Sequence, residues 1–425
     1  MPVKLSYHNS SLVQNPLAFD LLQTGEHALV SMHPEIVIPE LITVEHDTVV
    51  RVISEDKTRY RHFSFRRLHL LAVGKAAPWM ASSCRHIVGY ADTAVIAGPS
   101  GAAGAIAGWT WLHGDHPIPG WNSMAAARYI RRMTGKVSRD DLFIVLLTGG
   151  ASSIMSLPGR GFDLPSTALH IRELMHDGAT IHELNAYRRS VDQLKAGGLA
   201  RLVSPGQVIN LMVSDVPGDV LEDIGSGPTI PFRDHIARRD DERFGKDRWS
   251  YPYPVNIIAA RNIDAQNHCL EFLRSRGYGT KLSNNPIMGE ARIAGKLLAR
   301  YARMLRAGNC RNTCILFGGE TTVTVRGEGR GGRNLELAAS FAASISGMKG
   351  VYLLTLATDG KDGSSPSCGA LVHGSTLKSA GFSIQDVSQY LNNNDSYSLL
   401  SACGSTLYSG ATGTNVMDLA ILAIR

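Results

Sequence analysis

The sequence predicts an α/β protein with two domains built on mainly parallel sheets. Three apolar runs, residues 68–73, 142–147 and 208–213, are continuous rather than alternating, which is typical of parallel strands buried on both faces. Each run ends in a turn of small and polar residues, and helical patterns separate the runs. Because ligands bind at the carboxyl ends of such strands, we expect the functional site to lie where these turns collect.

The composition is that of a globular protein. The chain has 425 residues, which is enough for two or three domains, and 44% of them are apolar and 19% charged. The formal charge of +6 could indicate nucleic acid, but the basic residues form neither runs nor aromatic-basic clusters. We therefore expect a small anionic substrate and no nucleic acid.

The six cysteines are mostly far apart and form no C-x-x-C pair, which favours free thiols over zinc ligands. No signal peptide is evident, and the small-apolar stretch 94–109 is interrupted by Pro99 and too short to span a bilayer. We expect a cytoplasmic protein without a membrane contact.

The first two apolar runs end in turns suited to anions. Gly74-Lys75 places an ammonium group at the ligand edge of the sheet, although a lysine that caps surface carbonyls is an equal alternative. The turn at 148–153, Thr-Gly-Gly-Ala-Ser-Ser, offers backbone N–H groups and hydroxyls at a helix start, as a phosphate chain requires. Its small residues would also allow close helix-sheet packing.

The third run ends in Ser214-Asp215 and is followed by a second small-residue turn at 225–229. Asp215 could hold Mg²⁺ or accept a hydroxyl proton, and the alternative role is an Asx-turn or a helix cap. Asp359 and Asp362, after a later strand, present the same choice.

Residues 232–248 are densely charged and predict a surface excursion or linker between two domains. Beyond it we expect a second α/β unit with strands near 255–260, 313–317, 321–326 and 351–357. Helices are expected around 262–276 and 291–307.

A glycine-rich loop joins the strand predicted at 321–326 to a helix that begins at Asn334. Four glycines occur in residues 327–332, with Arg326, Arg330 and Arg333 in or beside them. Free backbone N–H groups, a helix dipole and guanidinium groups together predict an anion site. A solvated loop with surface arginines is the alternative.

The anion turns, the basic residues and the carboxylates together indicate phosphoryl transfer, which needs neutralised phosphate charge more than a special nucleophile. The chain has no P-loop motif, and it lacks the H-E-x-x-H, G-x-S-x-G and protein-kinase signatures.

The chain resembles the glycerate 2-kinase family, the type II glycerate kinases with a C-terminal MOFRL domain. The resemblance covers about residues 15–424 and includes the segments LLAVGKAAPWMA, GDHPIPG, TGGASS, VSDVPGD and GGRNLELA. It implies transfer of phosphate from ATP, with Mg²⁺, to the 2-hydroxyl of D-glycerate in a cleft between two α/β domains. The implied domains are 1–240, Rossmann-like, with the first 40 or so residues packing on the second domain, and 250–425, with the MOFRL region at about 310–425. Homodimer formation is left open.

The resemblance also implies roles for individual residues. Lys75 would steady the transferring phosphate, Asp215 would act at the metal or as base, and Arg333 would clamp transition-state charge or the substrate carboxylate. The implied nucleotide-binding residues are Thr148, Gly149, Gly150, Ala151, Ser152, Ser226 and Gly227. The implied substrate-binding residues are Arg188, Lys195, Glu320, Arg330, Asn334 and Asp359.

The sequence departs from the family pattern at several positions. Ala151 replaces a glycine, Gly120 and Pro366 each replace an aspartate, and the segment 188–198 has several changes, including Ser190 and Asp192. These departures leave open a kinase for a larger sugar acid, or a nucleotide binder without turnover. A hydroxypyruvate reductase is a third alternative, but the first strand is followed by Gly-Lys-Ala-Ala instead of a G-x-G-x-x-G motif.

Overall fold

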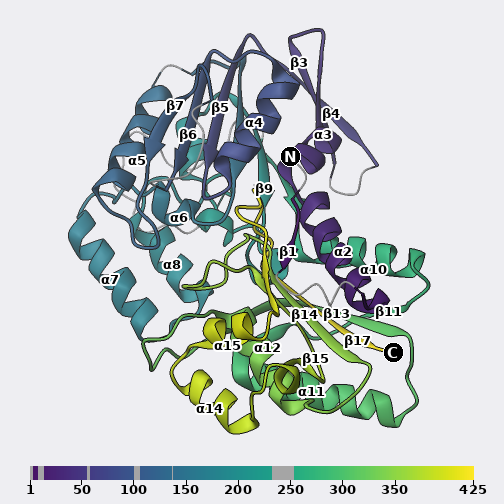
Figure 1. Ribbon diagram of the computed structural model, residues 1–425. Helices are drawn as coiled ribbons and strands as arrows, with labels where there is room; N and C mark the ends of the chain where they lie inside the picture. Colours follow the sequence, from purple (N-terminus) through teal and green to yellow (C-terminus); the bar gives the residue numbers. More distant parts are fainter. Residues whose placement is uncertain (1–2, 8–13, 55–57, 100–105, 136, 232–252) are drawn as a thin grey trace. The chain divides into compact units, whose positions relative to one another are not determined.

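The computed structural model describes residues 3–7, 14–54, 58–99, 106–135, 137–231 and 253–425 (Figure 1). It divides into two compact units, one of residues 34–260 and one of residues 1–33 with 261–425. The predicted linker at 232–248, including the boundary expected between residues 240 and 250, lies outside the described residues.

The unit of residues 34–260 contains a six-stranded sheet in the order β10-β9-β8-β5-β6-β7, and every neighbouring pair is parallel. The strands are β5 (Arg67–Val73), β6 (Thr93–Gly98), β7 (Thr110–His113), β8 (Asp141–Leu147), β9 (Gln207–Val213) and β10 (Val255–Ala260). The three continuous apolar runs are β5, β8 and β9, as predicted, and all seven residues of β8 are buried. The chain builds the sheet outward from β5 in one direction and then from β8 in the other. The ligand crevice of such a sheet lies where the order reverses, between β5 and β8.

Helices and a small sheet complete this unit. The helices are α3 (Pro34–Leu41), α4 (Ala77–Val88), α5 (Trp121–Met133), α6 (Ala151–Ile154), α7 (Leu164–His176), α8 (Ile181–Val191) and α9 (Gly198–Leu202). An antiparallel sheet is formed by β2 (Ile42–Glu45), β3 (Val49–Ile53) and β4 (Tyr60–Ser64).

The prediction that placed residues 255–260 in the second domain was wrong. These residues form β10, which pairs in parallel with β9 from Val255 opposite Ile209 to Ala260 opposite Val213. The strand itself was predicted correctly, but its sheet depends on a partner more than 40 residues away, separated from it by the charged segment. Local periodicity carries no information about such a partner.

The second unit contains a mixed eight-stranded sheet in the order β1-β16-β15-β14-β17-β13-β11, with β12 also on β13. Strands β11 (Gly279–Leu282) and β12 (Ile287–Glu290) run parallel to β13 (Thr313–Thr322), and the other pairs are antiparallel. The remaining strands are β1 (Ser6–Tyr7), β14 (Val351–Ala357), β15 (Gly369–His373), β16 (Thr406–Tyr408) and β17 (Asp418–Ile424).

Helices lie on both faces of this sheet. They are α2 (Pro16–Ser31), α10 (Asn262–Ser275), α11 (Ala291–Ala307), α12 (Arg333–Ser344), α13 (Thr376–Ser379), α14 (Ile384–Asn392) and α15 (Ser396–Ala402). Ile315 and Phe317 of β13 belong to the core shared with α11 and α12. Leu354 and Leu356 of β14 point the other way and approach Gly25 of α2. Asn15, which caps α2, also donates to the Tyr352 hydroxyl at 2.9 Å, so residues 16–31 pack within this unit (Figure 1).

One strand replaces the two that we predicted at 313–317 and 321–326. β13 is continuous through Gly318 and Gly319 and ends at Thr322, so residues 323–332 form a loop rather than a strand. Gly319 tolerates this course because its φ is +135°, a conformation that favours glycine. Among the described residues, no helix is long and apolar enough to cross a membrane.

Candidate active site

Two turns at the point where the strand order reverses are bonded to each other. Thr148 N–H donates to Val73 O at 3.0 Å, and Lys75 N–H donates to Gly149 O at 2.9 Å. The Thr148 hydroxyl accepts from Ala76 N–H at 3.0 Å. Gly74 has φ +132°, and a Cβ there would overlap the Thr148 side chain, so this close approach requires glycine. The structure therefore brings Lys75 and the 148–153 turn together at the expected edge of the sheet.

Ala151 does not obstruct this turn. Its side chain is 1% exposed and belongs to the apolar core, and a Cβ added at Gly225 would be 3.4 Å from its methyl group. The methyl group that replaces the family glycine thus faces the core. We find no reason in its position to exclude a phosphate chain from the turn.

A chain of hydrogen bonds connects the 148–153 turn to the 225–229 turn. Ser152 Oγ lies 2.8 Å from Ser226 Oγ, which donates to Asn185 Oδ1 at 2.9 Å. Ser226 is fully buried at φ +60°, between Gly225 and Gly227 at +59° and +62°. A left-handed serine costs about 1–3 kcal/mol, a strain that is common at functional sites. Asn185 was not predicted as a site residue, because an amide on the inward-facing side of a helix is not a specific pattern in a sequence.

Two cations and a histidine gather beside these turns. A Cβ added at Gly150 would be 2.9 Å from His116 Cδ2, so the imidazole lies directly against the turn. His116 is exposed to solvent, yet partial burial of its ring and then the positive charges of Lys75 and Arg188 lower its pKa below the usual value. Arg188 donates to Asn185 Oδ1 at 3.3 Å, and burial lowers its pKa to about 10. His116 was not predicted as a site residue.

Lys195 was predicted to bind substrate, but its side chain is fully buried. Its ammonium group donates to Met155 O, and burial lowers its pKa to about 8, an effect that Asp192 opposes. Asp192 is 2% exposed and accepts bonds of 2.8 Å from Ser156 Oγ, Leu157 N–H and Leu194 N–H. Lys195 and Asp192 therefore support the chain that follows α6. A contact between the Lys195 ammonium and a dissolved acid is contradicted by this burial.

Asp215 lies two residues beyond β9. The preceding Ser214 donates its N–H to Ala260 O at 3.0 Å, and the Ser214 hydroxyl accepts from Val216 N–H at 3.4 Å. Asp215 itself is half-buried. No group of three or more histidine, cysteine, aspartate or glutamate side chains suited to a metal occurs in the described part of the chain.

In the second unit, the glycine-rich loop is not the open anion site that we predicted. Its backbone N–H groups already have protein partners within 3.2 Å. The donors are the N–H groups of residues 326–331, and the acceptors are Asn393, Asn394, Asp395 and Ser364. A Cβ at Gly327 would be 2.5 Å from Asn393 Cα, and a Cβ at Gly329 would be 2.7 Å from Asp395 Cα. These glycines serve close packing of the chain against residues 393–395.

The N-terminus of α12 is also occupied by a protein carboxylate. Asp362 accepts from Asn334 N–H at 3.1 Å and Leu335 N–H at 2.9 Å. Burial raises the pKa of Asp362 to about 6 although these bonds oppose the rise. Asp362 therefore has the capping role that we left open, and Asn334 has its amide committed to it.

Arg333 is held by two carboxylates of its own unit. Its Nε donates to Asp418 Oδ2 at 2.5 Å and its Nη2 to Asp418 Oδ1 at 3.0 Å, and Nη1 pairs with Glu320. Burial raises the pKa of Asp418, while Arg333 acts to lower it. The predicted residues Arg333, Glu320 and Asn334 thus lie together, with Asp418 as the partner that the sequence did not reveal.

The other two predicted residues of this unit lie in separate settings. The Arg330 guanidinium lies 5.0 Å from the centroid of the Tyr397 ring, and its side chain is exposed. Asp359 accepts from Lys361 N–H at 3.1 Å in the turn after β14.

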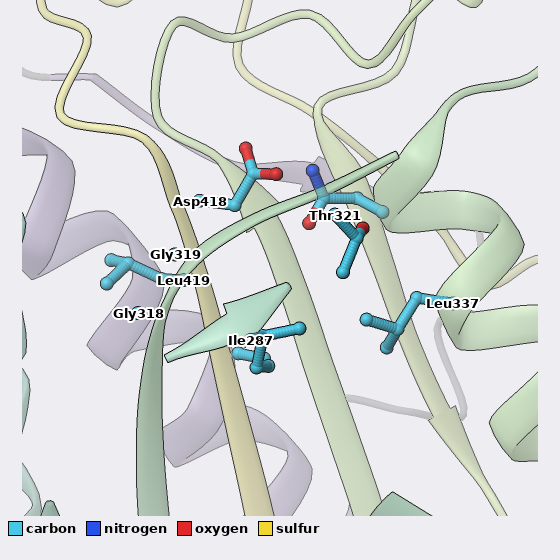
Figure 2. Close-up of a pocket in the computed structure, with 9 residues that line it drawn as sticks. Ile287, Gly318, Gly319, Thr321, Leu337, Asp418 and Leu419 are labelled. Carbon is cyan, nitrogen blue, oxygen red and sulfur yellow. The ribbon is translucent and has the colours of Figure 1, made fainter. Parts of the chain in front are cut away.

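A small pocket lies beside the Arg333–Asp418 pair. Figure 2 shows Asp418 and Thr321 on one side of it and Ile287 and Leu337 on the other. Its volume of about 10 Å³ matches one water molecule, so it is too small for a nucleotide or an acid substrate.

Comparisons with known proteins show the family of this chain. A model described as a domain of unknown function, DUF4147, matches residues 20–241, and the MOFRL family model matches residues 313–418. A D-glycerate 2-kinase of Thermotoga maritima is 34% identical over 84% of this chain and 90% of its own length. A glycerate 2-kinase of Pyrococcus horikoshii is 30% identical over 88% of this chain and 91% of its own.

A solved structure has the same fold. The crystal structure of glycerate kinase from Thermotoga maritima gives a TM-score of 0.80 at 30% identity, covering 96% of this chain and all of that one. A relative from Agrobacterium vitis, 30% identical over 84% of this chain and 99% of its own, is named a putative hydroxypyruvate reductase. The predicted family and the α/β fold class are confirmed, and the chain belongs to the glycerate 2-kinase family.

Proposed function

We propose that the protein transfers the γ-phosphoryl group of ATP to the 2-hydroxyl of D-glycerate and releases 2-phosphoglycerate and ADP. The observation that carries this proposal is the pair of bonded turns at the strand-order reversal, which puts Lys75, Arg188 and the 148–153 turn at the ligand edge of a parallel sheet. Phosphoryl transfer depends on this kind of positive, positioned environment.

The residues divide into three roles in this proposal. The 148–153 turn, with Ser226 and Gly227, receives the nucleotide phosphates, and Lys75 neutralises the charge on the transferring group. Arg188 binds the carboxylate of the acid. Arg333 binds either the charge that develops in the transition state or the carboxylate of the acid. For this, the Arg333 guanidinium exchanges at least part of its pairing with Glu320 for a contact with the ligand.

Mg²⁺ fits the proposal as the ion that accompanies ATP. Mg²⁺ is commonly bound through one or two carboxylates plus substrate phosphates, so a single protein ligand is sufficient. Asp215, half-buried at the end of β9, is the residue that would hold it. When bound, the ion would supply charge neutralisation at the phosphates. In the alternative role, Asp215 accepts the hydroxyl proton.

A kinase for a larger sugar acid stays the alternative. In the changed segment at 188–198, the Ser190 hydroxyl donates to Tyr187 O at 2.8 Å, and Asp192 is buried. Both side chains have bonds within the protein, which is why we favour D-glycerate. The reductase alternative has one relative's name in its favour, but the turn after β5 is Gly-Lys-Ala-Ala and lacks the dinucleotide motif.

We also propose a cytoplasmic setting, in line with the six free cysteines, all of which are described. The reaction needs a small anionic substrate and no nucleic acid. Homodimer formation stays a prediction.

The test is a coupled assay of ADP release with D-glycerate, L-glycerate and larger aldonates. We expect release that depends on D-glycerate and falls at least ~100-fold in kcat/KM for Lys75→Met, because electrostatic stabilisation of the transferring group is lost. Lys296→Met, a change at an exposed lysine of α11, is the matched control and should retain wild-type rates. Release that depends on no acid, or NADH oxidation with hydroxypyruvate at enzyme-like rates, would overturn the proposal.

A further inference from the structure

His116 is fixed in place by the loop that carries it. The neighbouring Asp115 accepts from Asn122 N–H at 3.0 Å and Ser123 N–H at 3.2 Å at the start of α5. On the other side, Gly114 N–H donates to Gly98 O at 2.9 Å. A Cβ at Gly114 would be 2.5 Å from Ile154 O, so the loop is pressed onto α6. These contacts hold the backbone beside His116, whose ring lies against Gly150.

The charges that act on this ring are both positive. Lys75 comes from the turn between β5 and α4, and Arg188 comes from α8. The buried Asp192 carboxylate acts on Arg188, whose pKa it raises against the effect of burial. A histidine beside two cations is neutral at pH 7, and its nitrogens are free to bond to a ligand at the same edge of the sheet.

Arg188 has bonding capacity left for the same ligand. Asn185 is 1% exposed, donates to Asp223 O at 3.1 Å, and accepts from both Ser226 and Arg188. This fixed amide orients one guanidinium nitrogen of Arg188. The Arg188 Nε is buried and has no hydrogen-bond partner in the part of the chain that the structure describes. Two cations and an imidazole thus lie at this edge of the sheet, and the buried Asp192 is a carboxylate that acts on Arg188.

We propose that His116 contacts the anionic ligand of this crevice and takes up one proton from solvent when the anion binds. The inference rests on the proposed function for the identity of the ligand, an acid carboxylate. The positive charges beside His116 attract any small anion in the same way. The sequence did not predict a role for His116, and the names of the relatives give it none.

The direction of the pH dependence follows from the linkage between proton binding and anion binding. In the free protein Lys75 and Arg188 disfavour the imidazolium form. A bound anion cancels part of that positive charge and accepts a hydrogen bond from the ring, so the pKa of His116 rises on binding. Between the two pKa values the complex holds more protons than the free protein. Anion affinity therefore rises as pH falls from the higher pKa of His116 in the complex towards its pKa of about 4 in the free protein, by up to about tenfold per pH unit for one coupled proton.

Titration calorimetry in buffers of different ionisation enthalpy measures this uptake directly. The probes are D-glycerate, whose carboxyl group titrates below the working range, and inorganic sulfate, at about pH 5 and about pH 7.5. We expect wild-type protein to take up about 0.5–1 proton per anion at the pH where the two states differ most. His116→Gln should take up none and bind with little pH dependence. His113→Gln, a change at an exposed histidine at the end of β7, is the matched control and should behave like wild type.

A second measurement needs no variant. The NMR resonance of His116 in the wild-type protein should titrate at higher pH with saturating sulfate than without it. Unchanged titration, or equal proton uptake in wild type and His116→Gln, overturns the inference even when the kinase assay succeeds. Failure of the proposed function is separate: wild-type protein would show His116-dependent uptake with sulfate but no acid-dependent ADP release. That outcome supports the anion site and removes glycerate as its ligand.

Discussion

Replacing Arg333 by methionine should destabilise the C-terminal unit as well as impair activity. The change removes two hydrogen bonds to Asp418, of 2.5 and 3.0 Å, and the ion pair with Glu320. The Asp418 side chain is 11% exposed and would keep its charge without an oppositely charged partner, with only the Asn334 side chain still bonded to it. Activity loss in such a variant therefore cannot by itself be assigned to catalysis.

The expected magnitude follows from this burial. Removing one partner of a fully buried pair costs about 3–5 kcal/mol. The Arg333 side chain is 30% exposed, so water reaches the remaining carboxylates, and we expect a loss of about 2–3 kcal/mol in the free energy of unfolding. Adding Asp418→Asn should recover most of it, with a coupling energy of about 2 kcal/mol in the double-mutant cycle.

The loss should also depend on pH. Without Arg333, burial raises the pKa of Asp418 above its unfolded value near ~4. A carboxyl group with a raised folded pKa keeps its stability at low pH and loses it as pH rises through that pKa. The deficit of Arg333→Met relative to wild type should therefore be smaller at pH 5 than at pH 8.

Urea denaturation followed by far-UV circular dichroism measures these values. Tryptophan fluorescence reports separately on the other unit, because the described tryptophans, at 79, 109, 111 and 121, all lie in residues 34–260. Arg330→Met, which removes only an exposed contact with Tyr397, is the control and should cost about 0.5–1 kcal/mol. Wild-type stability in Arg333→Met, or a coupling energy near zero, would refute the reasoning.

Two further changes test the corrected roles of predicted residues. Gly329→Ala places a Cβ 2.5 Å from Asn393 O and should lower the free energy of unfolding by about 1–3 kcal/mol, which a lower Tm would report. The control Gly308→Ala, whose Cβ would have its nearest neighbour at 3.5 Å, should change the Tm little. Equal Tm values for the two variants would contradict the packing role of the loop. Lys195 has a folded pKa of about 8, below its unfolded value near ~10.4, so the unfolded chain binds more protons and wild-type stability should rise between pH 8 and 10. Lys195→Met should lack that slope in urea denaturation at the two pH values, and an unchanged slope would place the ammonium in solvent.

Much of the fold could be predicted because it depends on local patterns. β8 and β9 were expected within a residue of their observed bounds, and α11 agrees at both ends. Continuous apolar runs report burial on both faces, and an amphipathic pattern reports a helix on a sheet. The sheet to which β10 belongs and the single long β13 were missed, since both depend on partners elsewhere in the chain.

The candidate site shows the same division. Lys75 and the 148–153 turn were expected together because turns after parallel strands meet at one edge of the sheet. His116 and Asn185 were missed because each acquires its role from a neighbour in another element: Gly150 for the ring of His116, and Ser226 for the amide of Asn185.

The sequence alone determined the strands and the turns that follow them, the sheet edge at which the candidate site lies and the family to which the protein belongs. Burial and turn chemistry are encoded in neighbouring residues, so a pattern of a few positions is enough to reveal them. Only the tertiary structure decided which groups remain available to a ligand. The N–H groups of the glycine-rich loop bond to residues about 65 positions away, and the Lys195 ammonium bonds 40 positions away. Whether a polar group is satisfied depends on partners brought in by folding, and no local pattern specifies them.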